Sequence, residues 1–178
     1  IISGPMNIKN VVIIGSGMAG ISLASELSEK RSVCILEKEK VISYHSTGRS
    51  MAFYIESYGN ETVRKLTTAS KVFFNDFEDP DSNRKLLNKR GVLHIGNQKQ
   101  SHIISNLYDN LIKLNSNFSL LNKSETMDLL PCLKDEYIDS SIYDFEASEI
   151  DISLMYDIYL KKLKRNNGII IKDIKIKE

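Results

Sequence analysis

Residues 11–20 read Val11-Val12-Ile13-Ile14-Gly15-Ser16-Gly17-Met18-Ala19-Gly20, and this stretch decides the fold. Its first four residues are β-branched and apolar without polar alternation, which predicts a strand buried on both faces. The glycines have the spacing at which a chain turns out of a strand, approaches a diphosphate closely and packs a helix against the strand. The N–H groups at the start of that helix face an anion. The stretch therefore predicts a dinucleotide-binding turn.

A helix and a second strand follow the turn and complete a βαβ unit. Apolar residues recur at helical spacing from Ile21 to Leu27, and residues 32–36 form a second apolar run that ends at Glu37. A carboxylate at the carboxyl end of the second strand accepts both hydroxyls of an adenosine ribose and disfavours a 2′-phosphate. The alternative is a strand-to-helix turn whose glycines are incidental.

Composition places the chain among globular proteins. It has 178 residues, of which 42% are apolar and 26% charged, and 24 basic against 23 acidic side chains leave a net charge of +1. This balance gives no electrostatic reason to bind nucleic acid. No apolar run is long enough to span a bilayer, and the first residues lack the features of a secretion signal. We predict a cytoplasmic protein with two reduced cysteines, and peripheral attachment to the inner membrane stays open. Met6 is the expected natural start, with residues 1–5 as an appendage.

The chain divides into three stretches of different character. Residues 6–83 contain the βαβ unit and a long polar segment, and we assign them to a dinucleotide-binding domain. Residues 84–148 mix strand and helix patterns without a second glycine turn, which predicts an inserted α+β domain. The first domain returns at 149–178, with a helix capped by Asp151 and a strand at Ile169-Ile170-Ile171. The predicted fold class is α/β, a Rossmann-like parallel sheet with an inserted α+β domain.

A polar block narrows the choice of dinucleotide. Tyr44-His45-Ser46-Thr47-Gly48-Arg49-Ser50 follows Leu36-Glu37-Lys38-Glu39 at the point where nicotinamide enzymes usually continue to alternate strand and helix. Together with residues 12–20, Tyr58-Gly59 and Glu149-Ile150-Asp151, this block resembles the FAD-dependent oxidoreductases of the D-amino acid oxidase type, especially bacterial D-amino-acid dehydrogenases of the D-arginine kind. The resemblance implies an FAD-binding sheet of the glutathione-reductase type. It also implies an apparently truncated chain, the N-terminal half of a flavoenzyme.

The resemblance also implies which residues hold FAD. The turn contributes Gly15, Ser16, Gly17, Met18, Ala19 and Gly20, and the adenosine half is served by Ala19, Glu37 and Lys38. The segment that runs past the diphosphate toward the isoalloxazine ring contributes His45, Ser46, Thr47, Gly48, Arg49, Ser50, Met51, Ala52 and Phe53. Arg49 supplies charge to a phosphate or forms a structural ion pair, and both readings stay open. His45 is expected to hydrogen-bond beside the cofactor rather than to attach it covalently.

Phe53 and Tyr58 are the substrate residues that the resemblance implies, although Tyr58 also suits a half-buried tyrosine at a helix entrance. Members of the family similar in motif have a histidine at Phe53 and an acid near Gly91, so both departures argue against a strongly basic substrate. The arginine that holds the substrate carboxylate is expected after residue 178, and no catalytic residue is assigned. His94 and His102 lack a carboxylate or cysteine at ligand spacing, so we predict structural histidines and no metal site.

The function implied by the resemblance is oxidation of the Cα–N bond of an amino acid, a D-amino acid or a glycine-like amine, by hydride transfer to flavin N5. The partner is a small amino-acid substrate, and the electron acceptor is a quinone, a carrier protein or oxygen. One alternative is an oxidoreductase of 2-hydroxy acids or glycerol 3-phosphate with the same fold. The other is a truncated, non-catalytic dinucleotide-binding fragment.

Overall fold

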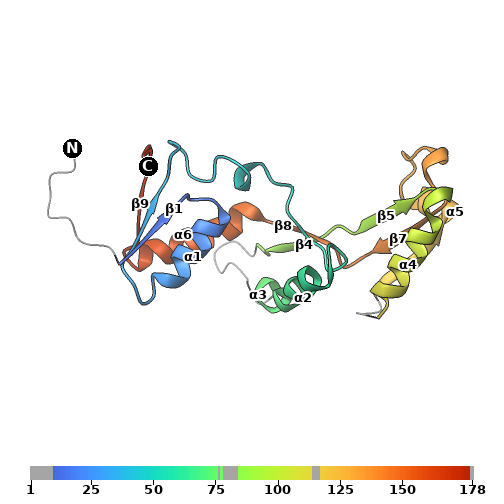
Figure 1. The fold of residues 1–178 in the computed structure, drawn as a ribbon, viewed down its shortest axis with the longest axis horizontal. Helices are drawn as coiled ribbons and strands as arrows, with labels where there is room; N and C mark the ends of the chain where they lie inside the picture. The colour runs from blue at the N-terminus through green and yellow to red at the C-terminus, as the bar shows by residue number, and fades with distance from the viewer. Residues whose placement is uncertain (1–9, 76, 78–83, 114–116, 177–178) are drawn as a thin grey trace. The chain divides into compact units, whose positions relative to one another are not determined.

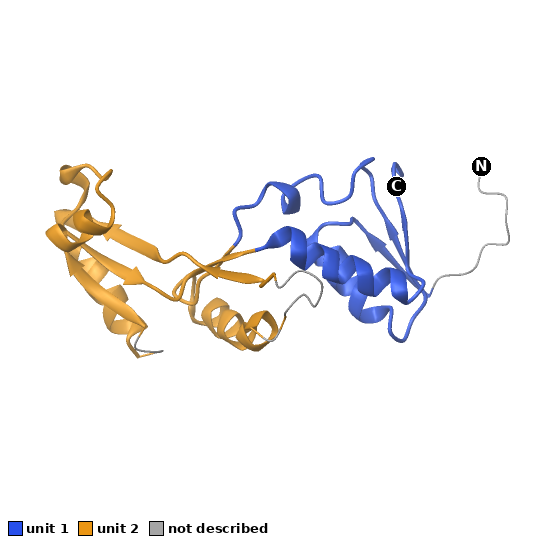
Figure 2. Cartoon of the chain, turned by 180° about the vertical axis from the view of Figure 1, so that it is seen from behind, with its two compact units in different colours: residues 1–52, 151–178 blue, residues 53–150 orange. Residues whose placement is uncertain are grey.

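The computed structural model describes residues 10–75, 77, 84–113 and 117–176. The chain forms two compact units: unit 1 comprises residues 1–52 and 151–178, and unit 2 comprises residues 53–150 (Figure 2). The first boundary thus lies at Ala52, earlier than the predicted end of the first segment at residue 83, which lies outside the described residues. The assignment of the predicted stretches to a cofactor domain and a substrate domain stays a prediction. No helix in the described ranges is long and apolar enough to cross a membrane.

Unit 1 is built on a parallel sheet of three strands in the order β1-β2-β9 (Figure 1). β1 (Val11–Ile14) leads through α1 (Met18–Leu27) into β2 (Val33–Leu36), and β9 (Ile169–Ile171) adds on the far side of β2. Ile13 is in register with Ile35, and Ile35 with Ile170. The predicted βαβ unit and the returning third strand are therefore confirmed.

The core of unit 1 lies between this sheet and two helices, α1 and α6 (Ile152–Arg165). Ile21 of α1, Ile35 of β2 and Leu163 of α6 are fully buried in one cluster. α6 begins at Ile152 because Asp151 caps it: the Asp151 carboxylate accepts from the Leu154 N–H at 2.9 Å. Lys162 then bridges to Glu26 of α1 and to Glu29 in the turn after α1, 2.8 Å from each. The core thus joins residues from both ends of the chain.

One expectation for β1 is wrong, because the strand is buried on one face only. Ile13 points into the core, whereas Val12 and Ile14 are 55% and 73% exposed. Successive side chains of a strand point to opposite faces, and α1 and α6 both pack against the face that carries Ile13. No element of the described part of the chain covers the face that carries Val12 and Ile14.

The described residues of unit 2 form two antiparallel sheets and four α-helices, which agrees with the predicted α+β character of the insertion. One sheet has the order β3-β8-β4, from Phe53–Tyr54, Ser148–Ile150 and Leu87–Lys89. The other has the order β5-β7-β6, from Val92–Gly96, Ser140–Asp144 and Phe118–Asn122. The helices are α2 (Glu61–Ala69), α3 (Lys71–Asn75), α4 (Ser101–Leu111) and α5 (Lys123–Leu129). Ile104 and Leu111 of α4 pack on Phe118 and Ile142 in the core of this unit.

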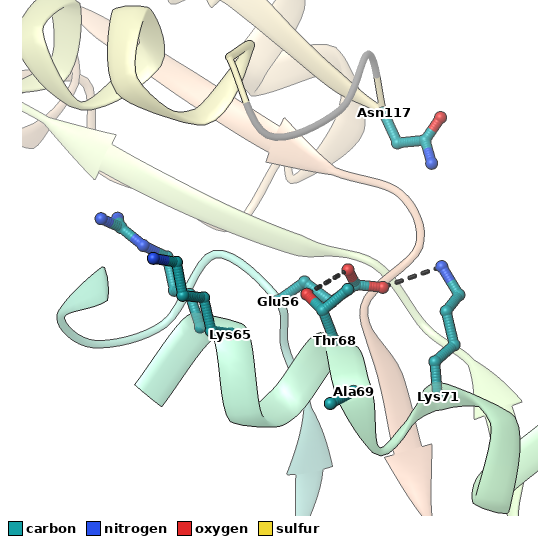
Figure 3. A pocket seen from close by; sticks show the side chains of 7 residues that line it. Glu56, Lys65, Thr68, Ala69, Lys71 and Asn117 are labelled. Atoms are coloured by element: carbon teal, nitrogen blue, oxygen red, sulfur yellow. Dashed lines mark hydrogen bonds and ion pairs between the residues drawn. The ribbon is translucent and has the colours of Figure 1, made fainter. Parts of the chain in front are cut away.

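A buried carboxylate ties the chain after β3 to the two helices that follow. Glu56 accepts from the Thr68 hydroxyl of α2 at 2.9 Å and from the Lys71 ammonium of α3 at 2.8 Å. Figure 3 shows both side chains pointing at Glu56, while Lys65 points away. The three interacting residues line a hollow of about 540 Å³, with Asn117 at another part of its rim. Burial alone raises the pKa of Glu56. The hydrogen bonds from Lys71 and Thr68, together with the positive charge of Lys71, outweigh this effect and lower the pKa.

We expect Glu56→Gln to lower the free energy of unfolding at pH 7 by about 1–3 kcal/mol, because Lys71 loses its charged partner in a part-buried site. Because the folded-state pKa of Glu56 is lowered, its ionised carboxylate stabilises the fold at pH values above the unfolded-state pKa of about 4.3. This stabilisation is lost as the pH falls through the folded-state pKa. Urea unfolding between pH 3 and pH 7 should therefore show a shallower acid limb in the variant. Glu61→Gln, which breaks the exposed Glu61–Lys65 pair, is the matched control and should change little. Parallel acid limbs for wild type and Glu56→Gln would contradict the assignment.

Gly91 has a backbone that other residues rarely adopt, with φ at +73°, and a Cβ built on it would lie 2.6 Å from the Tyr143 ring. We expect Gly91→Ala to cost about 1–3 kcal/mol of unfolding free energy from strain and this contact. Urea unfolding should show a smaller cost when the same change is made in a Tyr143→Ala background, because only the backbone strain remains there. An unchanged midpoint for Gly91→Ala would contradict this account.

Candidate dinucleotide-binding site

The predicted turn lies at the carboxyl ends of β1 and β2. The Gly15 N–H donates to the Leu36 carbonyl at 2.8 Å, which fixes the end of β1 against β2. A Cβ on Gly20 would collide with the Gly15 carbonyl, so the first turn of α1 packs directly on the loop backbone. This close approach is the helix–strand packing that the glycine spacing predicts.

Ser16, the residue between the first two glycines, is fully buried and bonds to the strand-end acid. Its N–H and its hydroxyl donate to the same oxygen of Glu37, Oε2, at 2.8 and 2.5 Å. The Glu39 N–H donates to the other oxygen, Oε1, at 2.9 Å. Burial alone raises the pKa of Glu37, but these hydrogen bonds outweigh it and lower the pKa, so the group is a carboxylate at neutral pH.

This arrangement limits what Glu37 can offer a ribose. An ionised carboxylate has about four acceptor positions, and Ser16 and Glu39 occupy three of them. At most one position is left, whereas two ribose hydroxyls need two. To accept both, Glu37 exchanges one internal bond, and the Ser16 hydroxyl is the donor that rotates most easily.

A hollow of about 370 Å³ opens beside Glu37. Ile14, Gly15, Leu36 and Lys38 line it together with residues 174–176. Its size lies in the range of small-molecule sites, and it sits outside the carboxyl ends of parallel strands, where open α/β sheets bind ligands. Apolar walls with one carboxylate at the edge suit an adenine ring and its ribose.

The N-terminus of α1 provides the donors for an anion. Gly17 is the N-cap, and no side chain caps the helix through it. The Met18 N–H donates to the Thr47 hydroxyl at 2.9 Å. Because a hydroxyl accepts and donates at the same time, Thr47 retains a proton to give to a phosphate oxygen. The predicted partners Gly17, Met18 and Thr47 are therefore brought together.

The polar block folds back on itself beside this helix end. The Gly48 N–H donates to the Ser43 carbonyl at 2.8 Å, and Thr47–Arg49 form a short 3-10 helix that contacts α6. The Arg49 guanidinium lies 4.7 Å from the centre of the Tyr44 ring, which is a cation–π contact, and its role toward a phosphate stays a prediction. The His45 Nε2 lies 3.0 Å from a Glu39 carboxylate oxygen. Ser46, Gly48, Ser50 and Met51 are exposed, and Ala52 is half-buried.

The two predicted substrate residues belong to unit 2. Phe53 of β3 pairs with Glu149 of β8, and the Tyr58 side chain is 68% exposed. Next to Tyr58, Ser57 is held by a buried polar cluster: its hydroxyl donates to Asp144 at 2.8 Å and lies 3.0 Å from His94 Nε2. Because the Ser57 proton goes to Asp144, His94 is the donor to Ser57, so the cluster lacks the serine-to-histidine proton path of a nucleophile.

Burial of His94 lowers its pKa, and the Asp144 charge opposes this only in part. Asp144 also accepts from the Ala147 N–H at 3.1 Å, so it supports the turn between β7 and β8. The described residues contain no group of three or more histidine, cysteine or acidic side chains that could hold a metal ion.

Tyr156 is the residue of this site that sequence reasoning missed. It lies in α6, far along the chain, and its hydroxyl donates to the Ser16 carbonyl at 2.8 Å. The helical spacing around it indicates an inward-facing side chain. No sequence signal shows which backbone atom its hydroxyl reaches, because that contact joins residues 140 positions apart.

Comparisons with known proteins give matches in sequence and in fold. Over 60 residues, which are 33% of this chain and 16% of the relative, the sequence is 42% identical to an uncharacterized protein of Methanocaldococcus jannaschii. The fold matches an L-α-glycerophosphate oxidase of Mycoplasma pneumoniae solved with FAD bound, with a TM-score of 0.78 at 20% identity, over 96% of this chain and 46% of that one. It also matches a glycine oxidase of Geobacillus kaustophilus, with a TM-score of 0.78 at 12% identity, over 94% and 47%.

The chain thus spans less than half the length of these solved structures. At 20% and 12% identity, these matches show a common fold. The decisive finding is the family model for FAD-dependent oxidoreductases, which matches residues 10–178. The chain belongs to this family, and its cofactor is FAD.

Proposed function

We propose that unit 1 binds the adenosine and diphosphate part of FAD, and that the chain serves in the oxidation of the Cα–N bond of an amino acid. The observation that carries the first part is the joining of Glu37 to the glycine turn through Ser16. It supports the proposal because hydrogen bonds through Ser16 join the carboxylate proposed for the ribose to the loop that leads into the helix N-terminus proposed for the diphosphate.

The residues present fit this part of FAD by their chemistry. Glu37 is ionised and keeps acceptor capacity, the hollow beside it is walled by Ile14 and Leu36, and α1 presents its first N–H groups. Thr47 adds a hydroxyl donor at the same place. We assign the adenosine to Glu37 and Lys38, and the diphosphate to Gly17, Met18 and Thr47.

The bound flavin supplies the hydride acceptor. The protein's task is to orient the substrate Cα–H toward it, a positioning effect worth several kcal/mol. From this chain, Phe53 and Tyr58 are the proposed wall of the substrate site. The polar block from Tyr44 to Ser50 is the proposed path past the diphosphate toward the flavin ring.

Three considerations support an amino acid without a strongly basic side chain, such as a small D-amino acid or glycine, as the substrate. The polar block from Tyr44 to Ser50 resembles that of D-amino-acid dehydrogenases, and one solved structure of similar fold is a glycine oxidase. In addition, Gly91 has no room for the acidic side chain that would read a basic substrate, because Tyr143 fills the space. The same resemblance favours a quinone or a carrier protein over oxygen as the electron acceptor.

A second candidate is oxidation of glycerol 3-phosphate or a 2-hydroxy acid. It is favoured by the similar fold of an L-α-glycerophosphate oxidase. Both candidates use the same nucleotide site, so they differ in the residues that contact the substrate.

We expect the purified chain to take up FAD and to show the flavin absorbance band after removal of free cofactor. Glu37→Gln should weaken FAD binding about ten- to a hundredfold, because an amide nitrogen cannot accept and the variant therefore loses bonds that hold the turn as well as an acceptor for the ribose. Equilibrium dialysis followed by flavin absorbance measures this change. Glu26→Gln, which removes an exposed carboxylate from α1, is the control and should bind FAD like wild type. A wild-type chain that stays colourless with excess FAD would contradict the proposal.

The substrate class is tested by anaerobic flavin bleaching in the FAD-loaded protein. We expect glycine and small D-amino acids to bleach the flavin band, whereas D-arginine, glycerol 3-phosphate and lactate leave it unchanged. Absorbance is recorded for each substrate under the same conditions. Bleaching by glycerol 3-phosphate or lactate alone would replace the first candidate by the second.

A further inference from the structure

We propose that Tyr156 is a positioning residue for the nucleotide diphosphate, because its hydroxyl holds the Ser16 carbonyl and thereby aims the Gly17 N–H at the ligand. The inference rests on the proposed FAD site and adds to it a residue from the far end of unit 1. It starts from one hydrogen bond, from the Tyr156 hydroxyl to the Ser16 carbonyl at 2.8 Å.

The tyrosine is a rigid support for that bond. Its side chain is 6% exposed and packs in the core cluster with Ile13 and Ile21. These two residues belong to β1 and α1, the elements that flank the glycine turn. A ring held on all sides cannot follow the loop if the loop moves. Burial raises the pKa of Tyr156, so its hydroxyl stays protonated and able to donate.

The geometry of the peptide bond carries this support to the ligand side. The bond between Ser16 and Gly17 is trans, since no cis peptide occurs in the described chain. In a planar trans peptide the carbonyl and the following N–H point in opposite directions. With the carbonyl turned toward α6, the Gly17 N–H points away from α6. This N–H belongs to the N-cap of α1 and has no acceptor among the described residues.

Ser16 is held from its other side by Glu37. All three polar groups of Ser16 are bonded, the N–H and the hydroxyl to Glu37 and the carbonyl to Tyr156. When a ribose displaces the Ser16 hydroxyl from Glu37, the turn loses one of these three bonds. Tyr156 then supports a larger share of the loop geometry in the ligand-bound protein than in the free one.

A purely structural tyrosine would behave differently. Its ring would contribute burial, and its loss would lower the stability of the whole unit without preference for any ligand. The hydroxyl, in contrast, acts on one peptide plane. Removal of the hydroxyl alone should therefore affect ligands that carry a diphosphate and spare those that carry only the nucleoside.

The test compares Tyr156→Phe with wild type in binding FAD, ADP and adenosine. We expect the affinities for FAD and ADP to fall about two- to tenfold, the range for one neutral hydrogen bond, while the affinity for adenosine stays within the error of wild type. Calorimetric titration measures all three on the same folded sample. The readout is the ratio of ADP to adenosine affinity, which a general loss of stability does not change.

Tyr159→Phe is the matched control. Tyr159 lies on the same helix and in the same core cluster, but the charges that act on its hydroxyl are those of Glu26 and Lys162. It should leave the ADP-to-adenosine ratio at the wild-type value. An equal fall of that ratio in both variants, or an unchanged ratio in Tyr156→Phe with FAD still bound, would overturn the proposed role of Tyr156 but leave the proposed FAD site standing. Wild type that binds neither FAD nor ADP would overturn the proposed function itself.

A second measurement needs no variant. Amide hydrogen exchange in wild type should slow at Gly17 when ADP is added and stay unchanged with adenosine, because only the diphosphate reaches that N–H. Unchanged exchange at Gly17 with saturating ADP would overturn the proposal even if Tyr156→Phe failed to fold.

Discussion

The candidate site depends on one constraint, the parallel pairing of β1 and β2. Parallel neighbours end at the same edge of a sheet, so Glu37 at the end of β2 comes to lie beside Ser16 just after β1. In an antiparallel pair the two residues would lie at opposite ends. The glycines are needed because this edge must also receive the start of α1 against the Gly15 carbonyl. Register, turn and acid therefore form one feature rather than three.

The same constraint explains why unit 1 needs residues from both ends of the chain. β1, α1 and β2 expose a helix flank and a strand edge that they do not cover themselves. α6 and β9 cover both, through Leu163 in the core and the pairing of Ile35 with Ile170. The support that Tyr156 gives to Ser16 arises from this closure. Residues 53–150 form their own compact unit between these two segments.

Sequence reasoning reached the parts of this design that follow local patterns. The apolar runs of β1, β2 and β9, the glycine turn and the strand-end acid Glu37 are each visible within a few residues, because periodicity and turn chemistry are local. It could not reach contacts between distant segments, such as Tyr156 on Ser16 or Ser57 between His94 and Asp144. It also placed both faces of β1 in the core, because an apolar run does not show how many faces its neighbours cover.

The hydrogen bonds that Glu37 already accepts from Ser16 and Glu39 affect how much each residue of the proposed site contributes to the affinity for a dinucleotide. A ribose hydroxyl that replaces the Ser16 hydroxyl on Glu37 exchanges one hydrogen bond for another. The net gain in binding free energy is therefore smaller than the roughly 0.5–1.5 kcal/mol that a new hydrogen bond contributes. In the proposed site, the larger contributions then come from the Gly17 N–H, which has no acceptor among the described residues, from the dipole of α1, and from apolar burial against Ile14 and Leu36. In the proposed site, Glu37 therefore serves to select a ribose without a 2′-phosphate, and we assign most of the binding free energy to the helix end and the hollow.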